Sequence, residues 1–197
     1  MNIVQVVGGP GSGKTTLASK LVEDWPGTAS LMRIDRYLRD RHSEDGEDFL
    51  LLPTSLDWPL VIAHLDLLAA GDDVTMPIYD WARGKRMTLS HPLPPEQVIQ
   101  SCDWLIIEGL FYVPEVSSVR LFVDAPADVR RNRMTARTSL LSQHLGEMYD
   151  LVAESAYQKH ILPQRDLADE VFDGRLDRDI LADQARRFVA SQWAGWG

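Results

Sequence analysis

The sequence predicts a three-layer α/β protein in which a parallel sheet of about five strands is covered by helices on both faces. Short, continuous apolar runs alternate with segments whose apolar residues recur at helical spacing, which is typical of buried parallel strands joined by helices. Three of these runs end at an acidic residue, namely Asp35, Glu108 and Asp124. Because ligands of such folds bind at the carboxyl ends of the strands, we expect the functional site at that edge.

The expected strands are the apolar runs Asn2–Val7, Ala29–Ile34, Trp104–Ile107, Val119–Val123 and Glu170–Phe172. The expected helices are Lys14–Asp24, Trp58–Ala70, Ala127–Arg137, Leu145–Leu162 and Asp177–Trp193. Glycine and proline end helices, so we expect three of them to stop at Pro26-Gly27, Gly71 and Pro163. Residues 74–79 and 86–89 flank a polar turn and are expected to form a small hairpin insertion.

Length and composition limit the class of protein. The chain has 197 residues, of which 45% are hydrophobic, so we expect one domain spanning residues 1–197. The net charge of −9 argues against non-specific nucleic-acid binding, because an acidic surface repels a phosphate backbone. The sequence has no apolar run near the roughly 20 residues of a membrane helix, and no signal-peptide pattern. We expect a cytoplasmic protein without nucleic-acid or membrane partners, and homo-oligomerisation stays open.

A glycine-rich segment near the N-terminus carries the strongest signal. Gly8-Gly9-Pro10-Gly11-Ser12-Gly13-Lys14-Thr15 fits the pattern G-x-x-x-x-G-K-[ST], and Thr16 follows it. The segment follows an expected strand and opens an expected helix, which is the context that a P-loop requires. In a P-loop the backbone N–H groups surround phosphate oxygens, the lysine reaches the β- and γ-phosphates and the hydroxyl binds magnesium. We therefore expect a nucleoside triphosphate, ATP with Mg²⁺, to bind these residues.

The remaining sequence narrows the class of P-loop protein. A small GTPase would carry an N-K-x-D-like element that reads guanine, and the sequence has none. A transporter ATPase would be longer and would carry a helical signature loop. These exclusions favour a small-molecule kinase.

Five further segments, in this order, resemble the uridine kinase and phosphoribulokinase family of P-loop kinases. They are Ile34-Asp35-Arg36-Tyr37, Leu56-Asp57-Trp58-Pro59, Pro77-Ile78-Tyr79-Asp80-Trp81 through Arg86, Ile106-Ile107-Glu108-Gly109, and Leu121-Phe122-Val123-Asp124 leading into three arginines. With the P-loop they extend from about residue 3 to about residue 175. The resemblance implies a P-loop NTPase fold with a helical lid at residues 127–162 and an acceptor-side hairpin at residues 74–90.

The resemblance also implies roles for two acidic residues at strand ends. Asp35 would act as the catalytic base that orients and deprotonates the acceptor hydroxyl, and it would bind the acceptor; the alternative is a turn or helix-capping aspartate. Glu108 would join Thr15 in the metal site, because Mg²⁺ prefers a few oxygen ligands and retained waters. The alternative for Glu108 is a solvated strand-end carboxylate.

The acceptor would be bound by residues of the second, third and fourth segments. These are Tyr37, Asp57, Tyr79, Trp81 and Arg86. Asp57 is placed to bind sugar hydroxyls, or to cap the next helix with Pro59 in its first turn. Tyr79 and Trp81 would form an aromatic wall, or would pack within the hairpin.

Three arginines of the expected lid helix share one face, because they are spaced three and four residues apart. They are Arg130, Arg133 and Arg137. The first two would bind the triphosphate, Arg133 and Arg137 would act with Lys14 in catalysis, and Arg137 would also contact the acceptor. The alternative is a solvated helix surface.

Two differences from the family pattern affect the choice of acceptor. Gly84 replaces a histidine that helps to read the pyrimidine base, and Thr138 replaces an aspartate after the last lid arginine. We therefore expect an ATP-dependent kinase for a hydroxyl of a small metabolite, with uridine one candidate. Nicotinamide riboside, pantothenate or a sugar phosphate are alternative acceptors, and a nucleotide-binding regulator without turnover is the alternative function.

Overall fold

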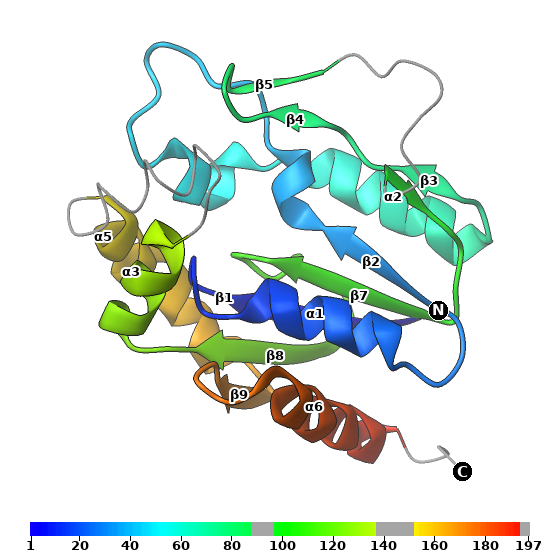
Figure 1. Cartoon of the computed structure of the whole chain (residues 1–197). Coiled ribbons are helices and arrows are strands. Elements are labelled where there is room, and N and C mark those ends of the chain that lie inside the picture. Colours follow the sequence, from blue (N-terminus) through cyan, green and yellow to red (C-terminus); the bar gives the residue numbers. More distant parts are fainter. Residues whose placement is uncertain (88–96, 137–151, 194–197) are drawn as a thin grey trace.

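The structure is a computed structural model, and it describes residues 1–87, 97–136 and 152–193. Its centre is a sheet of five parallel strands in the order β2-β7-β1-β8-β9 (Figure 1). The strands are β1 (Asn2–Gly8), β2 (Ala29–Arg33), β7 (Trp104–Gly109), β8 (Val119–Asp124) and β9 (Glu170–Asp173). The parallel sheet predicted from the apolar runs is confirmed.

Helices cover both faces of this sheet, so the three-layer prediction is also confirmed. Strand residues alternate between the two faces, and both faces are buried: Ile106 packs with α1 (Lys14–Glu23) and α6 (Arg178–Gln192), whereas Leu105 packs with α2 (Trp58–Ala70). Successive residues of one strand point to opposite faces of the sheet, and both faces are covered by helices. Each strand is therefore apolar along its whole length.

Shorter helical segments surround the carboxyl ends of the strands. They are the 3₁₀ helices η1 (Ile34–Tyr37), η2 (Phe49–Leu51) and η3 (Pro53–Ser55), the α-helices α3 (Ala127–Thr135) and α5 (Glu154–Ala156), the π-helix η6 (Tyr157–Ile161) and the 3₁₀ helix η7 (Leu162–Leu167). The segment formed by α5 and η6 ends at Ile161, one residue before the expected end at Leu162. Pro163 lies in the first turn of the following helix η7, where proline is tolerated.

The predicted hairpin is present but shorter than expected. β4 (Tyr79–Asp80) pairs with β5 (Lys85–Arg86) in antiparallel fashion, and the Asp80 side chain accepts hydrogen bonds from two backbone N–H groups of the turn. β3 (Val74–Thr75) instead pairs with β6 (Val98–Ile99). Residues 88 and 89 of the expected second strand lie outside the described residues.

The central strand is fixed by a buried polar side chain as well as by its ladder. Gln5 is fully buried, donates to Ser118 Oγ at 2.8 Å and accepts from the Val113 backbone N–H at 2.6 Å. Both amide atoms are therefore satisfied by residues more than a hundred positions away. In the ranges that the structure describes, no helix combines the length and the apolar character needed to cross a membrane.

Candidate functional site

The glycine-rich segment forms a tight loop between β1 and α1. Gly13 has a φ of 108° and serves as the N-cap of α1, a conformation that favours glycine. Gly8 packs so closely on the Val123 carbonyl oxygen of the neighbouring strand that any side chain there would clash. The sheet and the loop thus require glycine at both positions, and the loop presents the N-terminus of α1 to the edge of the sheet.

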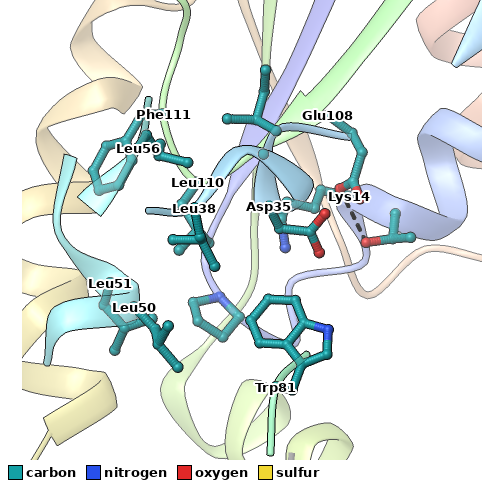
Figure 2. Close-up of a pocket in the computed structure, with 14 residues that line it drawn as sticks. Lys14, Asp35, Leu38, Leu50, Leu51, Leu56, Trp81, Glu108, Leu110 and Phe111 are labelled. Carbon is teal, nitrogen blue, oxygen red and sulfur yellow. Dashed lines mark hydrogen bonds between the residues drawn. The ribbon is translucent and has the colours of Figure 1, made fainter. Parts of the chain in front are cut away.

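Four polar residues from three segments of the chain line one cavity beside this loop (Figure 2). Lys14 and Thr15 come from the first turn of α1, Asp35 from η1 and Glu108 from the end of β7. The cavity has a volume of about 150 Å³. It lies at the carboxyl ends of β2, β7 and β1, which is the edge where parallel sheets hold their ligands.

Glu108 and Thr15 form a pair suited to a hard cation. Glu108 is buried, and Thr15 Oγ1 donates to its Oε2 at 3.1 Å. Burial raises the pKa of Glu108, and the nearby Asp35 raises it further, against the opposing effects of Lys14, Thr15 and Arg33. A hydroxyl oxygen already in contact with a carboxylate fits Mg²⁺, which takes few protein ligands and keeps waters. The metal role of the two residues stays a prediction.

The predicted lid arginines occupy different environments. The guanidinium of Arg133 donates to the carbonyl oxygens of Gly11 and Ser12 in the P-loop and of Gly174 after β9. Arg130 is buried, and its guanidinium lies 3.5 Å from the ring centre of Tyr157.

Arg130 is held by protein groups rather than directed at the cavity. It donates to the Ala125 carbonyl at 3.0 Å and to Glu154 at 2.7 Å. Its guanidinium thus joins α3 to the neighbouring helices, and its predicted contact with the triphosphate stays a prediction. Arg137 lies outside the described residues.

A second cavity, of about 400 Å³, adjoins the P-loop and is lined by residues of α3 and of the loop after β9. Its lining includes Gly13, Thr16, Arg133, Gly174 and Leu176. Thr16 was predicted to bind nucleotide, whereas Gly174 and Leu176 were missed. Asp173 ends β9 and Gly174 follows it, so the strand-end rule that identified Asp35 and Glu108 also applies to this loop.

Two of the predicted acceptor-binding aromatics do not reach the first cavity. Tyr37 is fully buried, and its hydroxyl is 2.8 Å from His64 Nδ1. Tyr79 is also buried, behind Trp81, with ring centres 5.1 Å apart. Trp81 lines the cavity and Tyr79 does not. The two tyrosines pack in the core, and their predicted contact with an acceptor stays a prediction.

Asp57 and Arg86 are bound to each other at a distance from the cavity lining. Asp57 caps α2 by accepting from the Leu60 backbone N–H at 3.1 Å, and Arg86 Nη1 donates to its other carboxylate oxygen at 2.8 Å. Arg86 also donates to the carbonyl oxygens of Leu38 and Tyr37. The capping alternative for Asp57 is realised, and neither residue lines the cavity that holds Asp35. Their predicted contact with an acceptor stays a prediction.

The rest of the described cavity lining has no charged side chain. Of these residues Pro10 was predicted as part of the P-loop, and the others were missed at the sequence level: Ile34, Leu38, Leu50, Leu51, Leu56, Gly109, Leu110 and Phe111. One signal could have identified Leu50 and Leu51. They belong to an apolar run, Phe49-Leu50-Leu51-Leu52, that directly follows a charged segment expected to be an exposed loop.

A model of the phosphoribulokinase / uridine kinase family matches residues 3–180. A uridine kinase of Deinococcus deserti is 34% identical over 145 residues, which cover 68% of this chain and 67% of that protein. A uridine kinase of Chloroflexus aurantiacus is 30% identical over 187 residues, covering 87% of this chain and 86% of that protein.

Solved structures show the same fold at lower identity. A shikimate kinase from Acinetobacter baumannii superposes with a TM-score of 0.52 at 13% identity, covering 98% of this chain and 96% of that one. A sugar kinase from Janibacter sp. HTCC2649 gives a TM-score of 0.53 at 16% identity, covering 96% and 95%.

Proposed function

The chain belongs to the phosphoribulokinase / uridine kinase family and is an ATP-dependent small-molecule kinase, and on this premise we propose that it phosphorylates a hydroxyl group of an acceptor bound beside Asp35. The observation that supports this most directly is the shared cavity. Asp35 lines the same space as the P-loop residues Lys14 and Thr15, so an acceptor hydroxyl at Asp35 would face the phosphates. A nucleotide-binding regulator would need the P-loop but no acid at this position.

Each polar residue of the cavity has a role in this proposal. Lys14 and the P-loop N–H groups bind the β- and γ-phosphates, and Thr15 and Glu108 hold Mg²⁺ directly or through water. The metal, when bound, would neutralise phosphate charge and orient the transferred group. Asp35 orients the acceptor hydroxyl and accepts its proton. Arg133 keeps the P-loop in place through its carbonyl contacts.

The nucleoside part of ATP is proposed to lie in the second cavity. That cavity borders the P-loop through Gly11 and Gly13 and carries both a hydrophobic residue, Leu176, and the cationic Arg133 and Arg178. A flat base bound there would leave the first cavity free for the acceptor. The lid function of residues 127–162, the acceptor-side role of residues 74–90, the single-domain organisation and the cytoplasmic location all stay predictions.

Uridine is the first acceptor to test, because the relatives are named uridine kinases. ADP release would be measured with ATP, Mg²⁺ and each member of an acceptor panel, for the wild type and for Asp35→Asn. We expect the substitution to lower turnover at least a hundredfold, since general-base catalysis contributes about 10²–10⁴. ATP affinity, measured by calorimetry, should change little.

A matched control is Asp66→Asn, since Asp66 is an exposed acid on α2 and does not line the cavity. It should keep full activity. Near-normal turnover of Asp35→Asn with an active acceptor would refute the proposed role of Asp35 as the base.

A further inference from the structure

One side of the P-loop backbone is packed against two residues from the helices that follow β8. They are Arg130 of α3 and Tyr157, which is the first residue of the π-helix η6. α3 and α5 lie side by side near the end of β1, where the loop begins (Figure 1). A contact at this place acts on the same backbone whose N–H groups are proposed to bind the phosphates.

The contact is tightest at Gly9. A Cβ atom added there would lie 2.7 Å from Tyr157 Cδ2, 2.8 Å from Tyr157 Cε2 and 3.1 Å from Arg130 Nη1. Carbon atoms in favourable contact are about 3.5–4.0 Å apart, so no side chain fits between the loop and this ring. Gly9 does not have a positive φ, unlike Gly11 and Gly13. The neighbouring ring, rather than the backbone conformation, therefore requires glycine at this position.

The ring of Tyr157 is itself held firmly. Its hydroxyl donates to Asp124 Oδ1 at 3.0 Å, and the Arg130 guanidinium lies 3.5 Å from the ring centre. Arg130 is fixed in turn by the Ala125 carbonyl and by Glu154. Burial raises the pKa of Tyr157, and the nearby Asp124 raises it further, so the hydroxyl remains a donor throughout the neutral range.

Asp124 connects this tyrosine to the central sheet. It is the last residue of β8, and its carbonyl oxygen accepts a hydrogen bond from the Gly174 N–H at 2.7 Å, in the loop that lines the second cavity. The ring thus bridges a strand end and the phosphate loop. Tyr157 also opens a π-helix, a conformation that is rare and is found frequently at functional sites.

We propose that Tyr157 is a positioning residue for the phosphates, whose ring holds the P-loop backbone at Gly9 so that the N–H groups of the loop point at them. This deepens the proposed kinase function and rests on it. Tyr157 lines neither the first cavity nor the second, so it acts through Gly9 and not on the substrate. Fixed N–H donors stabilise the charge that develops during transfer, and a displacement of about 1 Å can lower a rate about a hundredfold.

A cycle of two substitutions in the full chain tests the proposal. Gly9→Ala places a methyl group against the ring and should lower kcat/KM for ATP about a hundredfold. Tyr157→Val removes both ring atoms that meet Gly9 and should lower it about tenfold, because the loop loses its support. In the double variant the methyl group of Ala at position 9 has room. Its kcat/KM should therefore exceed that of Gly9→Ala by about tenfold or more, since residues in contact are coupled.

Nucleotide binding gives a second readout that needs no acceptor. The Kd for ATP with Mg²⁺, measured by calorimetry, should rise about tenfold or more in Gly9→Ala and should recover in the double variant. AMP has no β- or γ-phosphate for the loop to bind, so its Kd should hardly change in any of the variants. A general loss of structure would weaken ATP and AMP alike.

Tyr112→Val is the matched control. Tyr112 is also a buried tyrosine with an arginine over its ring, Arg120 at 5.7 Å, but it lines neither cavity and is not among the groups packed on the loop glycines. The control should lose stability yet keep its ATP affinity and turnover. Tyr157→Phe keeps the ring and loses only the bond to Asp124, so it should retain most of the activity.

Thermal unfolding identifies variants that do not fold. Tyr157→Met, whose flexible side chain can turn away from position 9, replaces Tyr157→Val in the cycle if the valine variant fails this test. A double variant that is no more active and binds ATP no better than Gly9→Ala would overturn the inference. Wild-type kcat/KM and ATP affinity in Tyr157→Val would overturn it as well.

Failure of the kinase function has a different signature. If no acceptor is phosphorylated by the wild type, but ATP affinity is lost in Gly9→Ala and recovers in the double variant, the role of Tyr157 in holding the phosphate loop is supported and the proposed transfer reaction is refuted. If an acceptor is phosphorylated and the double variant shows no recovery, the kinase function stands and the role of Tyr157 is refuted.

Discussion

Replacement of Arg86 by alanine tests how the acceptor side of the protein is held together. The Arg86 guanidinium donates to the carbonyl oxygens of Tyr37 and Leu38 and to a carboxylate oxygen of Asp57, each at 2.8 Å. These three bonds join the β4–β5 hairpin to the segment that carries Asp35 and to the start of α2. The variant loses all three, and the hairpin is then tied less firmly to the catalytic edge.

The size of the effect follows from the number and exposure of these bonds. A hydrogen bond that involves a charged group contributes about 1.5–3 kcal/mol, but such terms are not additive and water replaces part of them. The side chains of Arg86 and Asp57 are each 26% exposed, which is intermediate between a surface pair and a buried one. We therefore expect the free energy of unfolding to fall by about 2–4 kcal/mol. Turnover should fall about tenfold, because Asp35 is less precisely placed.

Urea unfolding followed by tryptophan fluorescence measures the change in stability. Arg83→Ala is the control on the same hairpin, because Arg83 is 77% exposed and forms only a surface ion pair with Asp80. Its loss should be less than about 1 kcal/mol. A similar loss in the two variants, or a loss below 1 kcal/mol for Arg86→Ala, would refute the reasoning.

The pH dependence of the pair can be examined in a double-mutant cycle with Asp57→Asn. Burial raises the pKa of Asp57, but the hydrogen bonds from Arg86 and from the Leu60 N–H outweigh it, so the net pKa lies below the ordinary 3.8. For a carboxyl with a lowered pKa, the stabilisation is present above the ordinary value and is lost as pH falls through the folded-state pKa. The coupling energy should therefore be the same at pH 7 and pH 5. Its disappearance by pH 5 would contradict the assignment.

Two further predictions concern the phosphate side of the site. Glu108→Gln should abolish turnover yet stabilise the metal-free protein at pH 7, since burial raises the pKa of Glu108 and makes its ionised form costly in the fold. This gain should shrink as pH is lowered toward the ordinary value of 4.5, and urea unfolding at pH 7 and pH 5 would show it; an unstabilised variant at pH 7 would contradict it. Arg133→Ala removes contacts to the Gly11, Ser12 and Gly174 carbonyls, so the Kd for ATP should rise about tenfold in calorimetry, which an unchanged Kd would disprove.

Much of the fold could be predicted because its signals are local and repeated. Each buried strand is a continuous apolar run, and the glycine pattern of the P-loop fixes one strand–loop–helix unit at the start. The exact extent of the hairpin was harder to predict. Val74 pairs with Ile99 of a distant segment, and no sequence pattern relates the two segments. Pro163 shows a similar limit, because proline is compatible with both the end of one helix and the start of another.

The candidate site also has residues that could be predicted from the sequence and residues that could not. Strand-end acids such as Asp35 and Glu108 could be located from the rule that parallel strands direct ligands to their carboxyl ends. Side-chain partners could not be predicted, because Arg86 is able to bind either an anionic ligand or Asp57 and the sequence does not distinguish the two. The leucines of the cavity were missed for a related reason: apolar residues in the core and in a ligand pocket have the same composition.

The placement of β1 in the middle of the sheet has a consequence for how the protein is made. β1 comes first in the chain, yet its two ladder partners are β7 and β8, and the polar partners of Gln5 are Val113 and Ser118. During synthesis β1 and the phosphate loop therefore emerge before β7 and β8, and more than half of the polypeptide must be made before these two partner strands can pair with β1. Contacts of such sequence separation slow folding, so we expect the nucleotide site to form late and nascent chains to depend on protection from aggregation.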